Sequence, residues 1–190
     1  MFKFKVNSPV NVDQLEIELT NYPNEEFKSY LVNGLKQGFD TGFKVLPTSS
    51  VECKNLRSTF FHKEHVADLI DVELRKGYLY GPFDSIPFSE YRINPIGVVE
   101  SKYSNKKRLI VDLSAPHENP EHPSLNELIC KEEYSLQYVT IDDAISIIKK
   151  LGKKSWLIKT DITDAFKIIP ILPKLWPYHG IQWNGKYYFF

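Results

Sequence analysis

The stretch Lys159-Thr160-Asp161-Ile162-Thr163-Asp164-Ala165-Phe166 decides how this chain is interpreted, because it places a carboxylate directly after an apolar run. Residues 155–161 have the composition of a strand, and residues 162–168 are predicted to turn or to begin a short helical step. A carboxylate at the end of such a strand can bind Mg²⁺ through its oxygens, with phosphate oxygens completing the shell. The alternative is that Asp161 caps the following turn, and these residues by themselves favour that interpretation.

Upstream of this stretch, two strand-like runs are joined by a polar turn. The runs are residues 95–99 and 108–113, and the turn is Tyr103-Ser104-Asn105-Lys106, so the pattern predicts a β-hairpin. Lys102 and Arg108 lie on this hairpin. Cations there can close over a triphosphate and neutralise its charge. A charged surface hairpin without such a role is the common alternative.

The rest of the chain alternates helical and extended patterns, which predicts an α+β fold. Apolar residues recur at helical spacing over 12–20, 25–37, 62–76 and 141–150. In the last of these helices Thr140 is the expected N-cap, and the inward positions are expected to be Ile141, Ala144, Ile145 and Ile148.

The predicted strands at the end of the chain are 178–183 and 186–190, joined by Asn184-Gly185 as a two-residue turn. Residues 39–58 are expected to form a loop, and the two prolines within residues 81–88 forbid a regular helix there.

Charge is balanced overall but unevenly placed. The formal net charge is +0, so whole-chain charge gives no argument for nucleic acid. Residues 91–114 and 149–174 are locally basic, while residues 115–148 are acidic. Two basic segments around an acidic one can present a basic surface after folding, although charged faces exposed to solvent are equally compatible with the pattern.

Several function classes receive no support from the sequence. Cys53 and Cys130 lie far apart without metal-ligand spacing, which predicts free thiols in a reducing compartment. The five His form no metal-binding pattern. We see neither an apolar run long enough to span a membrane nor a signal-peptide pattern at the N-terminus, so the expected location is intracellular.

The central stretch resembles motif A of reverse transcriptases, D-x-x-x-A-[FY]. The resemblance makes Asp161 the first catalytic carboxylate and gives Mg²⁺ a second ligand in the backbone carbonyl of Ile162. It assigns the backbone N–H groups of Asp164 and Ala165 to the triphosphate. Phe166 would be the aromatic gate under the sugar that selects deoxynucleotides; RNA-dependent RNA polymerases usually have an Asp at that position, so the resemblance favours DNA as the product.

The hairpin resembles the fingers motif of the same polymerases. Arg108 matches the arginine that stacks on the incoming base and reaches its phosphates, and Lys102 matches the lysine at the γ-phosphate. Lys106 and Lys107 are alternatives to Lys102, because the loop length differs. Asp112 matches an acid with an expected structural role.

Six motifs occur in the order found in reverse transcriptases: PIGVVESK, KKRLIVDLS, PSLNELI, YVTIDDAISIIKKLG, KTDITDAFKIIPI and GIQWNGKYYF. The chain is most similar to the DIRS/Ngaro type, the retroelements that integrate with a tyrosine recombinase. The resemblance implies a partial right-hand polymerase, with an N-terminal helical extension (1–50), a fingers-like region (51–154) and the start of the palm (155–190). Expected partners are an RNA/DNA template-primer and dNTP, with no membrane.

Two departures from the family bear on activity. The family has VPK where this chain has Val99-Glu100-Ser101-Lys102, and the acid there is expected to weaken phosphate binding. The LPFG motif, the x-x-D-D carboxylates and the thumb are expected to lie beyond residue 190, so the chain alone is predicted to be inactive and its last strands to expose an unpaired edge. Asp142-Asp143 cannot replace those carboxylates, because they precede Asp161 and fit a helix N-terminus.

Two alternatives to a polymerase region remain open from the sequence. One is a catalytically dead nucleic-acid-binding module derived from a retroelement, which the basic segments suggest. The other is an unrelated α+β interaction protein in which motif A is a coincidence.

Overall fold

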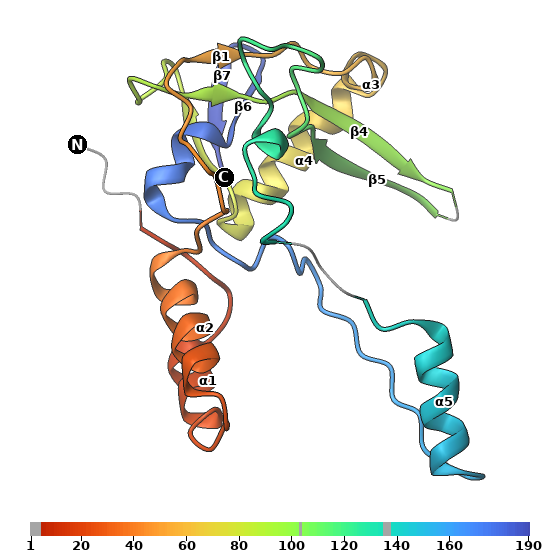
Figure 1. Ribbon diagram of the computed structural model, residues 1–190. Helices are drawn as coiled ribbons and strands as arrows, with labels where there is room; N and C mark the ends of the chain where they lie inside the picture. Colours follow the sequence, from red (N-terminus) through yellow and green to blue (C-terminus); the bar gives the residue numbers. More distant parts are fainter. Residues whose placement is uncertain (1–4, 103, 135–137) are drawn as a thin grey trace.

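The structure, a computed structural model, describes residues 5–102, 104–134 and 138–190 (Figure 1). Its helices are α1 (Val12–Glu18), α2 (Glu25–Gln37), α3 (Ser58–Phe61), α4 (Lys63–Lys76) and α5 (Ile141–Leu151), with 3₁₀ turns at Leu125–Glu127 and Pro173–Tyr178. Its strands are β1 (Val51–Glu52), β2 (Tyr80–Phe83), β3 (Arg92–Ile93), β4 (Ile96–Ser101), β5 (Ser104–Val111), β6 (Gly180–Trp183) and β7 (Lys186–Phe189).

Helices α1, α2, α4 and α5 form where the sequence predicts them, and the ends of α2, α4 and α5 carry local signals. Helix α3 was not predicted, and the loop expected over residues 39–58 contains β1. The Asn24 side chain accepts a hydrogen bond from the N–H of Phe27 at the start of α2, and Gly77 ends α4 in the left-handed conformation. Thr140 and Asp143 form a capping box at the start of α5, in which the hydrogen bonds from Thr140 lower the pKa of the Asp143 carboxyl. The interpretation of Asp143 as a capping residue is therefore confirmed.

The strands form two sheets. Strands β4 and β5 make an antiparallel hairpin, and the others make a five-stranded sheet in the order β1-β3-β6-β7-β2. Asn184 and Gly185, both with positive φ, connect β6 to β7 as predicted. The expected unpaired edge at these last strands was wrong, because β6 pairs with β3 and β7 pairs with β2.

One apolar core joins α4 to both sheets. Val66 and Ile70 of α4 pack in one cluster with Ile96 of β4, Ile181 of β6 and Tyr188 of β7. Helix α4 also contacts β5, and α3 contacts β4, so one face of the hairpin is covered by helices. The position of the hairpin is therefore fixed by the same core that holds the sheet.

The hairpin strands are longer than the sequence indicated. Strand β5 begins at Ser104 rather than at 108, so Lys106 lies in a strand and not in the turn. The predicted turn began at Tyr103, which lies outside the described residues. Ladder pairs such as Glu100↔Lys107 and Val99↔Arg108 extend the hairpin toward its tip.

Two predictions for residues 141–161 were wrong. Residues 155–161 form no strand, because a strand requires a hydrogen-bonding neighbour and none of the described segments pairs with them. Helix α5 has no buried residue, so its apolar stripe faces solvent rather than inward. Figure 1 shows α5 standing away from the body at the end of two long connections. Among the described residues, no helix is long and apolar enough to cross a membrane.

Candidate nucleotide-binding site

The turn over residues 163–167 holds the motif that the sequence singled out. The carbonyl of Asp164 accepts hydrogen bonds from the N–H groups of Lys167, at 2.7 Å, and Ile168, at 3.2 Å. Asp164 itself has a positive φ of 54°. The predicted turn is confirmed, and it makes a compact bend that brings residues 164–168 back to the body of the protein.

Ion pairs to α4 anchor this turn. Lys76 Nζ donates to the Asp164 carboxylate at 2.5 Å, and Lys167 Nζ donates to the buried Glu73 carboxylate at 2.6 Å. The hydrogen bond from Lys76 lowers the pKa of the Asp164 carboxyl, and the charges of Lys76, Lys167 and Lys106 act in the same direction. The sequence analysis missed these pairs, because partners 88 and 94 residues apart leave no local signal.

The charge of Lys106 links the turn to the hairpin. Lys106 is a residue of β5, yet its charge helps to lower the pKa of Asp164. Coulombic interactions of this kind weaken within about a Debye length, roughly 10 Å in ordinary buffers. Helix α4 contacts β5 and also pairs with Asp164 and Lys167, so the predicted fingers hairpin and the motif A turn both adjoin this helix.

The hairpin presents Arg108 on its open face. Along β5 the side chains alternate, so that Lys107, Leu109 and Val111 are partly buried while Arg108 and Ile110 are exposed. Lys106 shares the exposed side with Arg108. Arg108 and Lys106 are thus free of the core and available to an anionic ligand, and Lys102 lies exposed beside the tip of the hairpin.

The acid that departs from the family pattern has a partner across the hairpin. Glu100 pairs with Lys107, with 3.7 Å between Oε1 and Nζ. Lys107, one alternative to Lys102, is thereby turned toward Glu100 on the partly buried face. The structural role expected for Asp112 is confirmed, since its carboxylate accepts from the Ser114 N–H at 3.0 Å and lies 3.0 Å from His117 Nε2.

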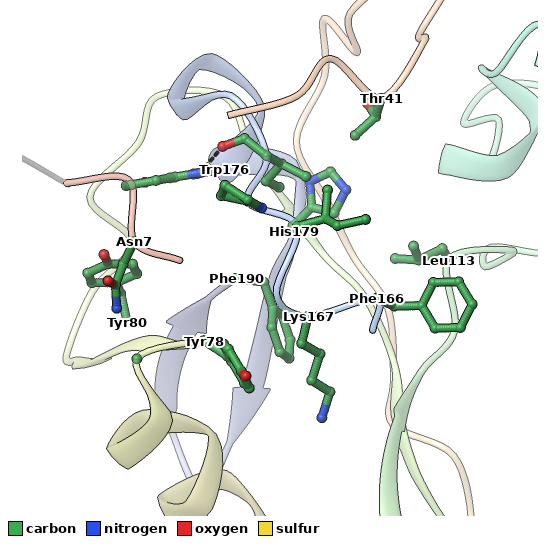
Figure 2. A pocket seen from close by; sticks show the side chains of 14 residues that line it. Asn7, Thr41, Tyr78, Tyr80, Leu113, Phe166, Lys167, Trp176, His179 and Phe190 are labelled. Atoms are coloured by element: carbon green, nitrogen blue, oxygen red, sulfur yellow. Dashed lines mark hydrogen bonds between the residues drawn. The ribbon is translucent and has the colours of Figure 1, made fainter. Parts of the chain in front are cut away.

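Phe166 lies at the rim of an apolar cavity of about 320 Å³. The Phe166 ring is 95% exposed, and Figure 2 shows it beside Leu113, on the opposite side of the cavity from Trp176. Tyr78, Trp176 and Phe190 supply aromatic walls. An exposed ring at this edge is available for contact with a flat ligand.

His179 also lines the cavity, and the sequence analysis did not single it out. Its Nδ1 lies 3.0 Å from the Leu175 carbonyl, and its ring stacks on Phe43. Burial lowers the pKa of the His179 imidazole. A neutral imidazole at this position adds another aromatic wall without adding charge.

Asp161 and Ile162 stand apart from these groups. Both are exposed and lie in irregular backbone before the turn. Asp161 makes no hydrogen bond or ion pair with any other residue that the structure describes, including Arg108. The structure therefore brings the hairpin to Asp164 but does not join the proposed catalytic carboxylate to it.

The donors present do not complete a magnesium site. A two-metal centre requires several carboxylates held together, and Asp161 with the Ile162 carbonyl supplies only one. The neighbouring Asp164 carboxylate is engaged by Lys76. Within residues 5–102, 104–134 and 138–190, no group of three or more His, Cys, Asp or Glu side chains could hold a metal ion.

A scan against protein-family models and a search of curated proteins found no match. Among solved structures, the chain is similar to the native prototype foamy virus protease-reverse transcriptase, at TM-score 0.50 and 14% identity over 100% of this chain and 25% of that one. Foamy viral protease-reverse transcriptase in complex with dsDNA matches at TM-score 0.46 and 17% identity, over 99% of this chain and 39% of that one. The chain thus spans about a quarter to two fifths of these proteins. The likeness to the native enzyme, which runs through the whole of this chain, shows a mixed α+β fold like that of a reverse transcriptase.

Proposed function

We propose that the chain is the fingers and palm-start region of a retroelement RNA-directed DNA polymerase, of the DIRS/Ngaro type that its motifs resemble. In this role it binds the triphosphate of a dNTP and an RNA/DNA template-primer. The observation that carries the proposal is that helix α4 contacts β5, whose open face carries Arg108 and Lys106, and also holds the motif A turn through its ion pairs with Asp164 and Lys167. The reverse-transcriptase-like fold is consistent with it.

Each proposed residue has a distinct part in ligand binding. Arg108 and Lys106 supply positive charge on an exposed strand face, where Arg can bind phosphate oxygens through two parallel hydrogen bonds. Lys102 is the proposed contact to the terminal phosphate. The backbone N–H groups of Asp164 and Ala165 are proposed to hold the triphosphate, and the exposed Phe166 ring to lie under the sugar.

Asp161 is proposed as the catalytic carboxylate and, with the Ile162 carbonyl, as a ligand of Mg²⁺. Bound Mg²⁺ would neutralise the phosphates, but this requires further carboxylates beyond those that the described residues bring together. We therefore propose that the chain by itself binds nucleic acid without extending a primer. The free thiols of Cys53 and Cys130 support the reducing, intracellular compartment expected for such a protein.

Duplex binding provides the test. Affinity for a fluorescent RNA–DNA duplex is measured by polarisation at several salt concentrations, for the unchanged chain and for Arg108→Gln. We expect affinity to fall with salt, and Arg108→Gln to weaken binding several-fold and reduce the salt slope by about one. Lys28→Gln in α2 is the matched control, since it removes one charge from a side chain that pairs with Glu25 of its own helix.

Three outcomes would each contradict part of the proposal. Equal effects of Arg108→Gln and Lys28→Gln would show that binding depends on total charge and not on the hairpin. Absent or salt-insensitive binding would favour the unrelated interaction protein. Primer extension in Mg²⁺ that disappears in Asp161→Asn would overturn the proposed inactivity while supporting the assignment of Asp161.

A further inference from the structure

Arg92 of β3 is a buried cation without a carboxylate partner among the described residues. Its side chain is 1% exposed, and its Nη1 donates a hydrogen bond to the Pro123 carbonyl at 2.7 Å. Its Nε has no acceptor in the part of the chain that the structure describes. The protein thus holds a guanidinium away from water and compensates it with a single neutral carbonyl.

This arrangement is unusual because arginine cannot lose its proton to escape burial. A charge taken out of water is costly unless a partner compensates it. Burial lowers the pKa of Arg92, as expected for a charge that is poorly solvated. An anion bound against the guanidinium would offset this cost.

The charged groups that act on Arg92 do not supply that anion. The charges of Cys53 and Glu127 oppose the effect of burial on the pKa of Arg92. Burial raises the pKa of the Cys53 thiol, so this group is neutral at physiological pH. The Glu127 carboxylate is engaged in the capping box, where it accepts from both the N–H and the hydroxyl of Ser124. The Arg92 charge is therefore open to an external partner.

A cavity of about 190 Å³ leads to Arg92. It is lined by residues of the loop 45–49, by residues 121–123, and by Leu128 and Arg92. Pro123, whose carbonyl accepts from Nη1, is thus itself a lining residue, so the guanidinium end of Arg92 lies at the cavity wall. Arg92 is the one fully buried residue of this lining.

Hydrogen bonds between the two segments fix the cavity walls. The N–H of Lys44 donates to the Leu128 carbonyl at 2.8 Å, and Ser49 Oγ lies 3.3 Å from His122 Nδ1. The loop and the segment 121–128 are held together by these contacts. The cavity is therefore largely preformed, as ligand sites usually are.

The size and the lining of the cavity indicate the class of anion. Its volume is below the roughly 300–1,000 Å³ of pockets for drug-sized ligands, so the ligand is small. Leu46, Pro47 and Leu128 supply apolar walls, and the exposed Glu121 disfavours a second negative charge. A carboxylate matches the fork of a guanidinium through two parallel hydrogen bonds.

We propose that this cavity is a binding site for a small organic monocarboxylate, whose charged group binds Arg92 and whose apolar body packs against the wall of the loop 45–49. None of the lining residues belongs to the nucleotide-binding site proposed above. The two sites can therefore be tested separately.

Titration with benzoate tests the site, with the ¹H–¹⁵N signals of the arginine Nε–H groups as the readout. The chain has four arginines, so the signal of Arg92 is identified by its loss in Arg92→Met. At constant ionic strength we expect benzoate to shift this signal, neutral benzamide to leave it in place, and the signal of the exposed Arg57 to stay unchanged. An Arg92 signal that benzoate does not move, or that benzamide moves equally, would overturn the proposal.

Two substitutions of Leu46 test the cavity while Arg92 stays in place. Leu46 is 41% exposed, so the fold tolerates a polar side chain there. Leu46→Glu adds a competing carboxylate to the wall and is expected to weaken benzoate binding about tenfold, whereas the uncharged Leu46→Gln changes it less than about twofold. Equal affinities of these two variants would contradict the proposed position of the ligand.

Inorganic phosphate at the same ionic strength separates the two kinds of anion. We expect it to move the Arg92 signal less than benzoate does, because phosphate has no apolar body to pack in the cavity. A larger shift with phosphate than with benzoate would overturn the assignment of a carboxylate and identify a phosphate site instead.

Discussion

Single side chains hold the motif A turn in place, and Lys167 is the one that pairs with a buried carboxylate. It pairs with Glu73, whose side chain is buried and whose second oxygen, Oε2, has no hydrogen-bond partner among the described residues. A buried carboxylate is costly unless it is paired. The turn is therefore attached to α4 by a contact that stabilises both elements.

Replacing Lys167 by Met is expected to destabilise the protein by about 1–3 kcal/mol, since it leaves the Glu73 carboxylate unpaired. Urea unfolding of the two chains measures the difference. Lys186→Met removes a more exposed pair, with Asp84, and is expected to cost no more than about 0.5 kcal/mol. Adding Glu73→Gln to Lys167→Met should recover part of the lost free energy of unfolding. If Lys167→Met and Lys186→Met lowered the free energy of unfolding equally, the burial of Glu73 would be unimportant.

The His179 imidazole makes stability depend on pH. Burial lowers the pKa of this imidazole in the folded protein, so the unfolded chain binds more protons as the pH falls below about 6.5. The free energy of unfolding is therefore expected to decrease on acidification from pH 7, until the folded form also titrates.

Urea unfolding at several pH values measures this loss. His179→Gln should reduce the slope of the free energy of unfolding against pH. His65→Gln, at an exposed histidine, is the control and should leave the slope unchanged. If the slope were the same in all three chains, the pH dependence of stability could not be assigned to His179.

At the scale of elements, local sequence signals were sufficient to predict an element wherever the residues that begin or end it are its own caps or turns. The capping box at Thr140, Gly77 after α4 and Asn184-Gly185 between β6 and β7 each determine a local backbone conformation. Residues 155–161 have equally strong strand composition but form no strand, because pairing depends on a neighbour that composition does not reveal.

Helix α5 depends on its cap more than a packed helix would. No residue of α5 is buried, so its stability comes from the capping box, its termini and any partner. Thr140→Ala is expected to destabilise the helix by about 1 kcal/mol and to increase amide exchange in α5 about fivefold, without affecting α4. Hydrogen exchange measured by mass spectrometry reports both helices, with Ser146→Ala as the control. An unchanged rate in α5 would mean that other contacts hold it.

At the scale of the whole molecule, the sequence predicted the fold class, while the attachment of the motif A turn to the body had to come from the structure. The α+β order follows from the pattern of the chain, and the hairpin from its two apolar runs. The ion pairs of Asp164 and Lys167 with α4 join segments far apart in sequence, and no periodicity encodes them. Asp161 remains the least constrained of the proposed residues, because the strand expected to carry it does not form.

The body and the α5 segment are expected to differ in stability. Core residues such as Val66 and Ile181 are fully buried, whereas α5 contributes nothing to that core. Amides of α4 and β6 should therefore exchange only through global unfolding, and those of α5 through local opening. Hydrogen exchange measured by mass spectrometry under native conditions distinguishes the two parts, and equal exchange rates in α4 and α5 would contradict the expected difference in stability.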